Sequence, residues 1–296
     1  MTLSIRPIDG PIGAIVTGWK SDSDLEDDEL ASVKTALRER LVLVFRGQPE
    51  IADLDLIRFA GRFGDLLKGS EFLRDAGDHP EILPVTNMLD GNGIPKGTGE
   101  SNSIGWHSDY SYVDRVGKES FLNAVILPEH PPRTSFTDQY RALETLPTSK
   151  IDVLRALKAF HSVTKIVTGD EIDSGIGERF RAKVARDEEL GISRPPIPEA
   201  QHPIIVRHPE SGRELLYVSP QITRYVVGMP RDESDALLRE LHEHSTRPEF
   251  VYHHEWEIGD LVVFDTLGTM HKRDAWDARE PRYMRQLSTV CRLESS

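Results

Sequence analysis

Apolar residues recur at helical spacing in two early segments of the chain. Leu25, Leu30, Val33 and Leu37 share one helix face, which predicts an amphipathic helix over 22–40. The same reasoning predicts helices over 51–63, 139–146, 151–160 and 233–244.

Short apolar runs predict strands along most of the remaining chain. They lie at 41–45, 82–87, 121–127, 250–253, 261–264 and 284–290, with hairpins expected in 1–20 and 204–218. Because strands span the whole length and helices lie mostly near the start, we predict a mainly β fold with helical decoration, a sandwich or barrel, in one domain covering residues 1–296. Residues 88–105 and 165–200 are rich in glycine and charge and long for loops, so we predict that they act as lids.

Charge and cysteine content narrow the class of protein. The net charge is −13, from 36 basic and 49 acidic residues, which disfavours nucleic acid and anionic membrane surfaces as partners. The single cysteine, Cys291, cannot form an internal disulfide. No apolar stretch has the length of a membrane span, and the first residues lack a basic segment followed by an apolar run. We therefore expect a cytoplasmic protein whose partners are neither nucleic acid nor membrane.

The candidate chemistry begins at Trp106-His107-Ser108-Asp109. In an extended segment, residues i and i+2 point to the same face, so His107 and Asp109 present an imidazole and a carboxylate together. A second, distant histidine would complete two histidines and one carboxylate, a set that leaves three iron(II) positions open. Alone, the His-x-Asp pair is weak evidence, because surface pairs of this kind arise by chance.

Most other histidines fit that third position poorly. His253 and His254 are adjacent on a strand and face opposite ways, so both cannot bind one metal and we expect packing or solvent-facing roles. His208 lies before Pro209 at a turn and is expected to be structural. His271 is better placed, because it follows a turn, the buried strand at 261–264 and a loop.

Two residues are candidates for holding an anionic cosubstrate. Arg282 comes shortly before the last predicted strand, and its guanidinium can clamp a carboxylate with two parallel hydrogen bonds. Thr134 can add a hydroxyl to the same carboxylate. Taken singly, each is more often an ordinary surface or loop residue, and only their combination with the metal residues makes them notable.

The motifs, taken in order, resemble those of the taurine and 2,4-dichlorophenoxyacetate dioxygenase family. The matching segments cover most of the chain: Leu43 to Gln48, Phe59 to Gly64, Trp106 to Asp109, Thr134 with Asp138 to Pro147, His208 to Val218, and Gly259 to Asp265 followed by His271 and Arg282. Each match is modest alone, but six in family order are specific.

The resemblance implies both a fold and a reaction. The fold would be a double-stranded β-helix, the jelly-roll core of cupin-like proteins. His107, Asp109 and His271 would bind Fe(II), while Thr134 and Arg282 would hold 2-oxoglutarate. With O2, such an enzyme hydroxylates an aliphatic C–H and releases succinate and CO2. Desaturation or ring formation stays possible. Homo-oligomers are usual in the family.

Departures from the family pattern concern the substrate. Family members that act on sulfonates or carboxylates often carry a second arginine four residues after the cosubstrate arginine, where this chain has Gln286. Arg285 would face away from that site. A glutamine suits a neutral or zwitterionic polar group, although Lys68 or Lys118 could supply a cation. Trp106 and Asn102 are further candidate substrate contacts.

Other functional classes are less consistent with the sequence. A cupin-type isomerase or hydrolase would use the same ligands without 2-oxoglutarate and would leave Arg282 without a role. A non-catalytic jelly-roll binding protein would use the histidines structurally. A serine hydrolase lacks its Gly-x-Ser-x-Gly turn. A halogenase of this fold would need a small residue in place of Asp109.

Overall fold

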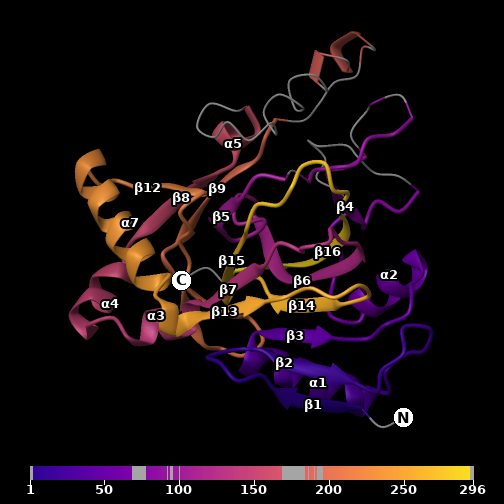
Figure 1. Ribbon diagram of the computed structural model, residues 1–296. Helices are drawn as coiled ribbons and strands as arrows, with labels where there is room; N and C mark the ends of the chain where they lie inside the picture. Colours follow the sequence, from indigo (N-terminus) through magenta and orange to yellow (C-terminus); the bar gives the residue numbers. More distant parts are fainter. Residues whose placement is uncertain are drawn as a thin grey trace.

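The described strands form four sheets (Figure 1). The computed structural model describes residues 3–68, 78–91, 93, 96–99, 101–168, 184–185, 187–189, 191 and 196–293. The predicted mainly β fold with helical decoration is confirmed. None of the described helices combines the length and apolar character needed to cross a membrane.

The largest sheet has seven strands and joins both ends of the chain. In spatial order they are β1 (Ser4–Pro7), β2 (Ala14–Thr17), β3 (Val42–Phe45), β14 (Leu261–Asp265), β6 (Arg115–Ile126), β16 (Tyr283–Arg292) and β4 (Leu83–Thr86). All pairings are antiparallel except that of β2 with β3.

Three smaller sheets complete the β structure. The four-stranded sheet has the order β13 (Val251–His254), β7 (Thr134–Asp138), β15 (Thr269–Arg273) and β5 (Ile104–His107). The three-stranded sheet has the order β12 (Thr223–Val226), β8 (Lys158–Ser162) and β9 (Glu199–Pro203), and β10 (Ile205–Arg207) pairs with β11 (Glu214–Leu216).

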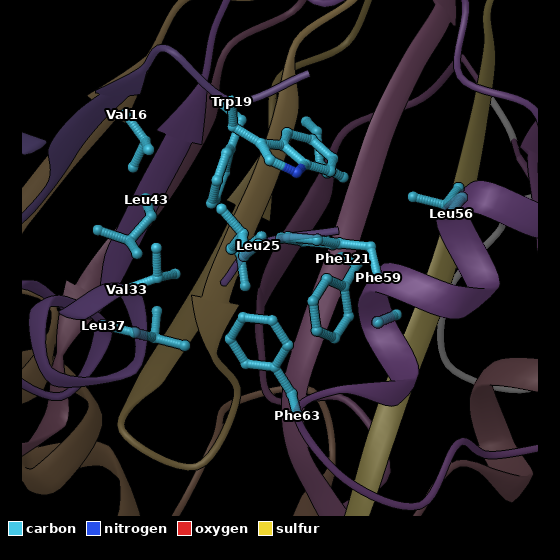
Figure 2. Close-up of a cluster of buried hydrophobic side chains, with 14 of the residues drawn as sticks. Val16, Trp19, Leu25, Val33, Leu37, Leu43, Leu56, Phe59, Phe63 and Phe121 are labelled. Atoms are coloured by element: carbon cyan, nitrogen blue, oxygen red, sulfur yellow. The ribbon is translucent and has the colours of Figure 1, made fainter. Parts of the chain in front are cut away.

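Helices α1 (Asp27–Arg40) and α2 (Asp53–Gly61) cover one face of the large sheet. Figure 2 shows the apolar cluster between these helices and the sheet, where Val33, Leu37 and Phe59 of the helices pack with Leu43 and Phe121 of the strands. Each such side chain, when fully buried, contributes about 1.5–3 kcal/mol of hydrophobic stabilisation. The opposite face of the same strands is also buried, since Val42, Val44, Val262 and Phe264 pack in a second cluster. Burial on both faces explains why β3 and β14 are continuous apolar runs.

The other described helices are short or pack against the two-stranded and three-stranded sheets. They are α3 (Gln139–Glu144), α4 (Thr148–Leu154), α5 (Thr164–Thr168), α7 (Arg231–Ser245) and the 3-10 turn η1 (Pro248–Phe250). α3 and α7 contribute Ala142, Leu143, Leu238 and Leu241 to one apolar cluster.

Several predicted boundaries are corrected. The helix expected over 151–160 is wrong in its second half, because α4 ends at Leu154 and Lys158–Ser162 is strand β8, buried at Ala159 and His161. The first helix begins at Asp27, where Glu26 and Glu29 form a capping box, and ends at Leu41, a left-handed C-cap with φ 61°.

Strands β5, β7, β8, β9, β12 and β15 were not predicted from the sequence. Each is only four or five residues long and carries at least one polar side chain, which leaves too little apolar alternation to reveal a strand. The two predicted lids fall partly outside the described residues: 92, 94, 95 and 100 in the first, and 169–183, 186, 190 and 192–195 in the second. The lid assignment stays a prediction.

Candidate metal centre

Strands β5 and β15 bring the two candidate histidines together. The strands pair antiparallel with His271 opposite His107, and the centroids of the two imidazoles lie 4.1 Å apart. Asp109 joins them, and the three side chains each offer a ligand atom within 4.8 Å of the others. In the part of the chain that the structure describes, this is the one His/Cys/Asp/Glu group of three that could hold a metal ion.

Asp109 reaches the histidines by a turn and not along a strand. β5 ends at His107, and Tyr110 adopts a left-handed backbone with φ 57°, which is uncommon for a non-glycine residue. Asp109 Oδ1 lies 3.6 Å from His107 Nε2, and its Oδ2 lies 3.8 Å from His271 Nε2. The predicted convergence of His107 and Asp109 is present, although the extended segment assumed for it stops two residues early.

Both imidazoles are in a form that can bind a cation. His107 Nδ1 lies 2.8 Å from the Gly105 carbonyl oxygen, which only accepts, so the neutral ring carries its proton on Nδ1 and presents the Nε2 lone pair. Burial, with the neighbouring His107, lowers the pKa of His271 to about 3. Neutral imidazoles and one carboxylate are the donors of a facial non-haem iron(II) site, so these residues fit that metal.

Arg282 is a buried cation that no acidic side chain neutralises among the described residues. Its side chain is 2% exposed and its Nε has no hydrogen-bond partner there. Burial, with repulsion from Arg273, lowers its pKa to about 9. The guanidinium lies 5.4 Å from the Trp276 ring centroid, and Arg273 lies 4.3 Å from the same ring. A buried charge of this kind is costly unless an anion pairs with it, so the position fits a ligand carboxylate.

The hydroxyl of Thr134 accepts a hydrogen bond from Trp256 and keeps its own proton for another partner. Trp256 Nε1 donates to Thr134 Oγ1 at 2.9 Å, and an indole N–H cannot accept a hydrogen bond. The threonine proton is therefore available to an acceptor, although the residue is 2% exposed. Thr134 is paired with Arg273 in the register of β7 and β15. Arg273 also lies near enough to Arg282 to lower its pKa. Thr134 and Arg282 are therefore both neighbours of Arg273.

The substrate candidates have different surroundings. Gln286 is next to the cluster, because its Nε2 donates to Asp109 Oδ2 at 2.7 Å. Trp106 adjoins His107 on β5, and its ring lies 5.1 Å from Lys272 Nζ. Asn102 has an exposed side chain, and its backbone oxygen accepts from Arg273 Nη2. Lys68 is 72% exposed and lies 3.9 Å from Glu81, so its contacts give no link to the metal residues.

Several sequence interpretations concerned residues outside the metal site. Arg285 faces away, as expected, and donates to Asp53 and Asn123. His208 is fully buried and accepts backbone N–H groups of Glu210 and Ser211 at Nδ1, which confirms a structural role. His253 bonds to Ser135 and His254 pairs with Asp260, so neither joins the metal group.

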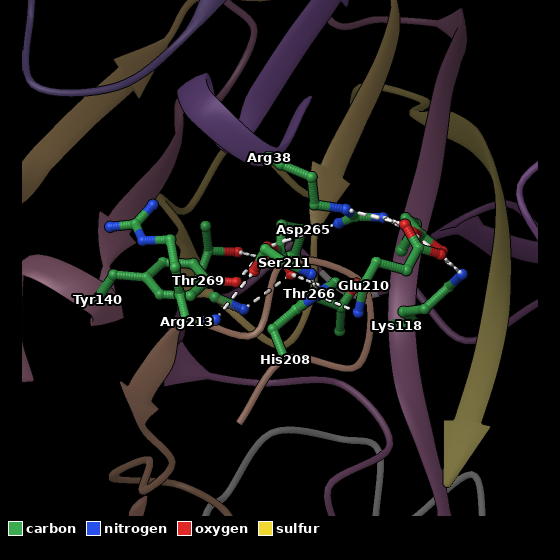
Figure 3. A network of polar contacts seen from close by, with 12 residues as sticks. Arg38, Lys118, Tyr140, His208, Glu210, Ser211, Arg213, Asp265, Thr266 and Thr269 are labelled. Carbon is green, nitrogen blue, oxygen red and sulfur yellow. Dashed lines mark hydrogen bonds and ion pairs between the residues drawn. The ribbon is translucent and has the colours of Figure 1, made fainter. Parts of the chain in front are cut away.

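Lys118 belongs to a second buried polar cluster, which we call the charge network (Figure 3). The network contains Arg38, Lys118, Glu119, Glu210 and Asp265. Arg38 pairs with Glu119, with Glu210 at 3.0 Å and with Asp265 at 3.6 Å, and Lys118 pairs with Glu210 and lies 3.5 Å from Glu119. The suggestion that Lys118 supplies a cation to the substrate is wrong, because two carboxylates already hold its ammonium group.

The charge network also shapes the turn that leads to His271. Asp265 accepts from the Tyr140 hydroxyl at 2.8 Å and from the Gly268 N–H at 2.9 Å, and its carbonyl accepts from Thr269 Oγ1 at 2.7 Å. Gly268 lies so close to Tyr140 that an added Cβ would meet its ring at 2.1 Å. This packing sets the start of β15, the strand that carries His271.

Sequence reasoning missed Arg273, Trp256 and Trp276. Arg273 had a local signal, because it lies two residues after His271 on the same strand and faces the same side. The two tryptophans had none, since their contacts with Thr134 and with the arginines join segments distant in sequence.

Comparison with known proteins places this site in a family. Residues 4–288 match the family described as taurine catabolism dioxygenase TauD, TfdA family. The chain is 35% identical to pentalenolactone F synthase of Streptomyces avermitilis over 94% of this chain and 91% of that protein. It is 30% identical to the alpha-ketoglutarate-dependent 2,4-dichlorophenoxyacetate dioxygenase of Cupriavidus pinatubonensis, over 95% and 96% respectively.

A solved structure agrees with these relatives. The crystal structure of AAD-2 in complex with Mn(II) and N-oxalylglycine superposes with a TM-score of 0.74 at 27% identity, covering 98% of each chain. The resemblance predicted from the motifs is thereby confirmed, together with the expected enzyme class and its cofactors. The chain belongs to the TauD/TfdA family and is an iron(II)- and 2-oxoglutarate-dependent dioxygenase.

Proposed function

We propose that His107, Asp109 and His271 bind the iron(II), and that the enzyme hydroxylates an aliphatic C–H of a small organic molecule. The observation that carries this assignment is the group of three ligand atoms within 4.8 Å. Its donors are two neutral imidazoles and one carboxylate, which leave room for a chelating cosubstrate and O2. When bound, iron(II) and 2-oxoglutarate supply the oxidising chemistry, in which one O2 and one 2-oxoglutarate give hydroxylated product, succinate and CO2.

We assign the far carboxylate of 2-oxoglutarate to Arg282 and Thr134. Arg282 supplies the buried positive charge, and Thr134 supplies the hydroxyl proton that Trp256 leaves free. Trp276 offers an aromatic face to both Arg273 and Arg282, which favours their closeness. The far carboxylate of 2-oxoglutarate would then balance the buried positive charge of Arg282. The cupin-type isomerase or hydrolase alternative gives Arg282 no such partner.

The chain's other contributions are orientation and exclusion of water. His107 is oriented by the Gly105 carbonyl, so its Nε2 faces the metal position. Phe136 stacks on His271 at a centroid distance of 6.0 Å, and the tilted ring of Phe264 lies 5.2 Å away, so both give the His271 ring an apolar surrounding. A dry, fixed site is what such chemistry needs, since the reactive step belongs to the cofactors.

Several finer expectations belong to this proposal. The seven-stranded and four-stranded sheets, with apolar residues of both in one cluster, support a double-stranded β-helix core. A single domain with lids at 88–105 and 165–200, a cytoplasmic location, a homo-oligomer and a substrate with a neutral or zwitterionic group near Gln286 remain predictions from the sequence.

The proposed ligands can be tested by visible spectroscopy without knowing the substrate. Iron(II) chelated by a 2-oxo acid absorbs weakly in the visible, so we expect this absorption when anaerobic wild-type protein receives iron(II) and 2-oxoglutarate. His271→Ala should lose it, and Arg282→Met should need a much higher 2-oxoglutarate concentration. A wild-type protein that binds iron(II) but never develops the absorption would refute the cosubstrate assignment. Succinate release then identifies substrates in a screen of small molecules.

A further inference from the structure

Asp109, the proposed carboxylate ligand, has one hydrogen-bond donor among the described side chains. Gln286 Nε2 lies 2.7 Å from Asp109 Oδ2, while the two histidine nitrogens lie 3.6 and 3.8 Å from the carboxylate oxygens. Gln286 is on β16 and is half-buried. Its neighbour Arg285 faces the opposite side of the strand toward Asp53 and Asn123, as strand alternation requires.

The orientation of the Gln286 amide follows from chemistry. An ionised carboxylate only accepts hydrogen bonds, so the NH2 group of the amide must face Asp109. The amide oxygen then points elsewhere. Because Oδ2 accepts this bond, Oδ1 is the carboxylate oxygen whose lone pairs stay available to a metal.

The binding mode of Asp109 decides how many metal positions remain open. A carboxylate that binds through one oxygen leaves three of six positions open beside the two histidines. A 2-oxo acid that chelates takes two of these, and O2 needs the third. If both oxygens of Asp109 bound the metal, that third position would be lost. A donor on Oδ2 therefore favours the state in which the cosubstrate and O2 fit together.

The backbone around Asp109 is held from the same strand and from β6. Ser288 lies two residues beyond Gln286 on the same face of β16, near the buried phenol of Tyr110. Gly117 of β6 lies so close that an added Cβ would be 3.0 Å from the Asp109 carbonyl oxygen. The left-handed turn at Tyr110 is thus fixed, and Gln286 acts on a carboxylate whose main chain cannot shift easily.

We propose that Gln286 is a positioning residue that keeps Asp109 bound to iron(II) through Oδ1 alone and so preserves the third open position. This inference rests on the proposed metal ligands. It concerns a side chain that touches the ligand and not the metal, and it assigns Gln286 a role besides contact with substrate.

Three substitutions separate hydrogen bonding from shape. Gln286→Leu removes the donor, Gln286→Glu keeps the shape but replaces the donor with an acceptor, and Gln286→Lys keeps an N–H donor. Loss of a partner that orients a metal ligand typically weakens metal binding about 10–100-fold. We expect this weakening for Leu, a larger one for Glu because two carboxylates repel, and near wild-type affinity for Lys. Gln201→Leu, on an exposed position of β9, is the matched control.

The measurements are the anaerobic iron(II) dissociation constant and the absorption spectrum of the Co(II) protein with 2-oxoglutarate. The Co(II) spectrum reports coordination number, so it should change in the Leu and Glu variants and stay unchanged in Lys and in the control. A changed spectrum with unchanged folding supports the role of Gln286. If Leu and Glu match wild type in both measurements, the inference is wrong while the ligand assignment stands. If wild type binds no iron(II), the proposed ligands fail first, and the inference fails with them.

Discussion

The candidate metal centre and the charge network are both polar clusters within the fold, yet they are built on opposite principles. In the network, Arg38 and Lys118 are neutralised by Glu119, Glu210 and Asp265. At the metal centre and beside it, the described residues leave Arg282 without a carboxylate and present two imidazoles and Asp109 to one point.

The difference separates structure from function in energetic terms. A closed network stabilises the fold only while complete, and removal of one member leaves an uncompensated charge. An open cluster costs stability in the free protein and regains it when a ligand supplies the missing partner. The open cluster is therefore where a metal and an anion are expected, and the closed one explains how β15 and the 208–213 loop are held in place.

The largest expected effect is loss of metal binding in His271→Ala. Iron(II) affinity should fall by more than the about 10–100-fold that residues hydrogen-bonded to a ligand typically contribute, because a ligand itself is lost. The unfolding free energy should change by about 1 kcal/mol, a common value for point mutants. Anaerobic titration and thermal unfolding measure the two. His254→Ala is the matched control, since His254 is buried but paired with Asp260. Equal metal loss in both variants would contradict the comparison.

In the charge network, we expect a substitution to lower stability and to leave the iron(II) affinity unchanged. Glu119→Ala removes a fully buried carboxylate that contacts both Arg38 and Lys118 and leaves their N–H donors with fewer acceptors, so the unfolding free energy should fall by about 1–3 kcal/mol. Its iron(II) affinity, measured below the melting temperature, should stay at the wild-type value. A stable Glu119→Ala protein would show that the network is not what holds this region.

Arg282→Met should weaken 2-oxoglutarate binding about 30-fold or more, since truncating one partner of a buried charge pair costs about 2–5 kcal/mol. Without ligand, the variant should be as stable as wild type or more so, because an uncompensated cation is removed. Arg285→Met, three residues further along the chain on β16, removes a paired arginine and should lower stability but not 2-oxoglutarate affinity. Calorimetric titration measures the 2-oxoglutarate affinity, and thermal unfolding measures the stability. If Arg285→Met lost affinity and Arg282→Met lost stability, the roles assigned to the two arginines would be wrong.

The smallest effect is expected for Thr134→Val. A hydrogen bond to a charged group contributes about 1.5–3 kcal/mol, so 2-oxoglutarate affinity should fall about tenfold or somewhat more. Thr137→Val, on the same strand, breaks a bond to the Ser245 carbonyl and should affect stability only. If both valine variants bind 2-oxoglutarate equally, Thr134 has no part in the cosubstrate site.

Local pattern was sufficient for the apolar elements and for part of the site. β3 and β14 are buried on both faces, and α1 buries one stripe, so each carries a hydrophobic signal within its own residues. His107 and Asp109 were predicted together because two residues of separation controls where side chains point, and Thr134, Arg282 and His271 came from motif order.

What only the tertiary structure decided is carried by polar strands and distant pairings. β5, β7 and β15 are four or five residues long and carry the polar residues His107, Thr134 and His271, so an apolar alternation marks them too weakly. The bond from Gln286 to Asp109 spans 177 residues, and the one from Trp256 to Thr134 spans 122. Such contacts depend on how the sheets stack, which is set by the burial of apolar surface over the whole chain. The sequence by itself determined which side chains are available as ligands. The packing of the two sheets determined which of these side chains lie close together and which charges have no partner.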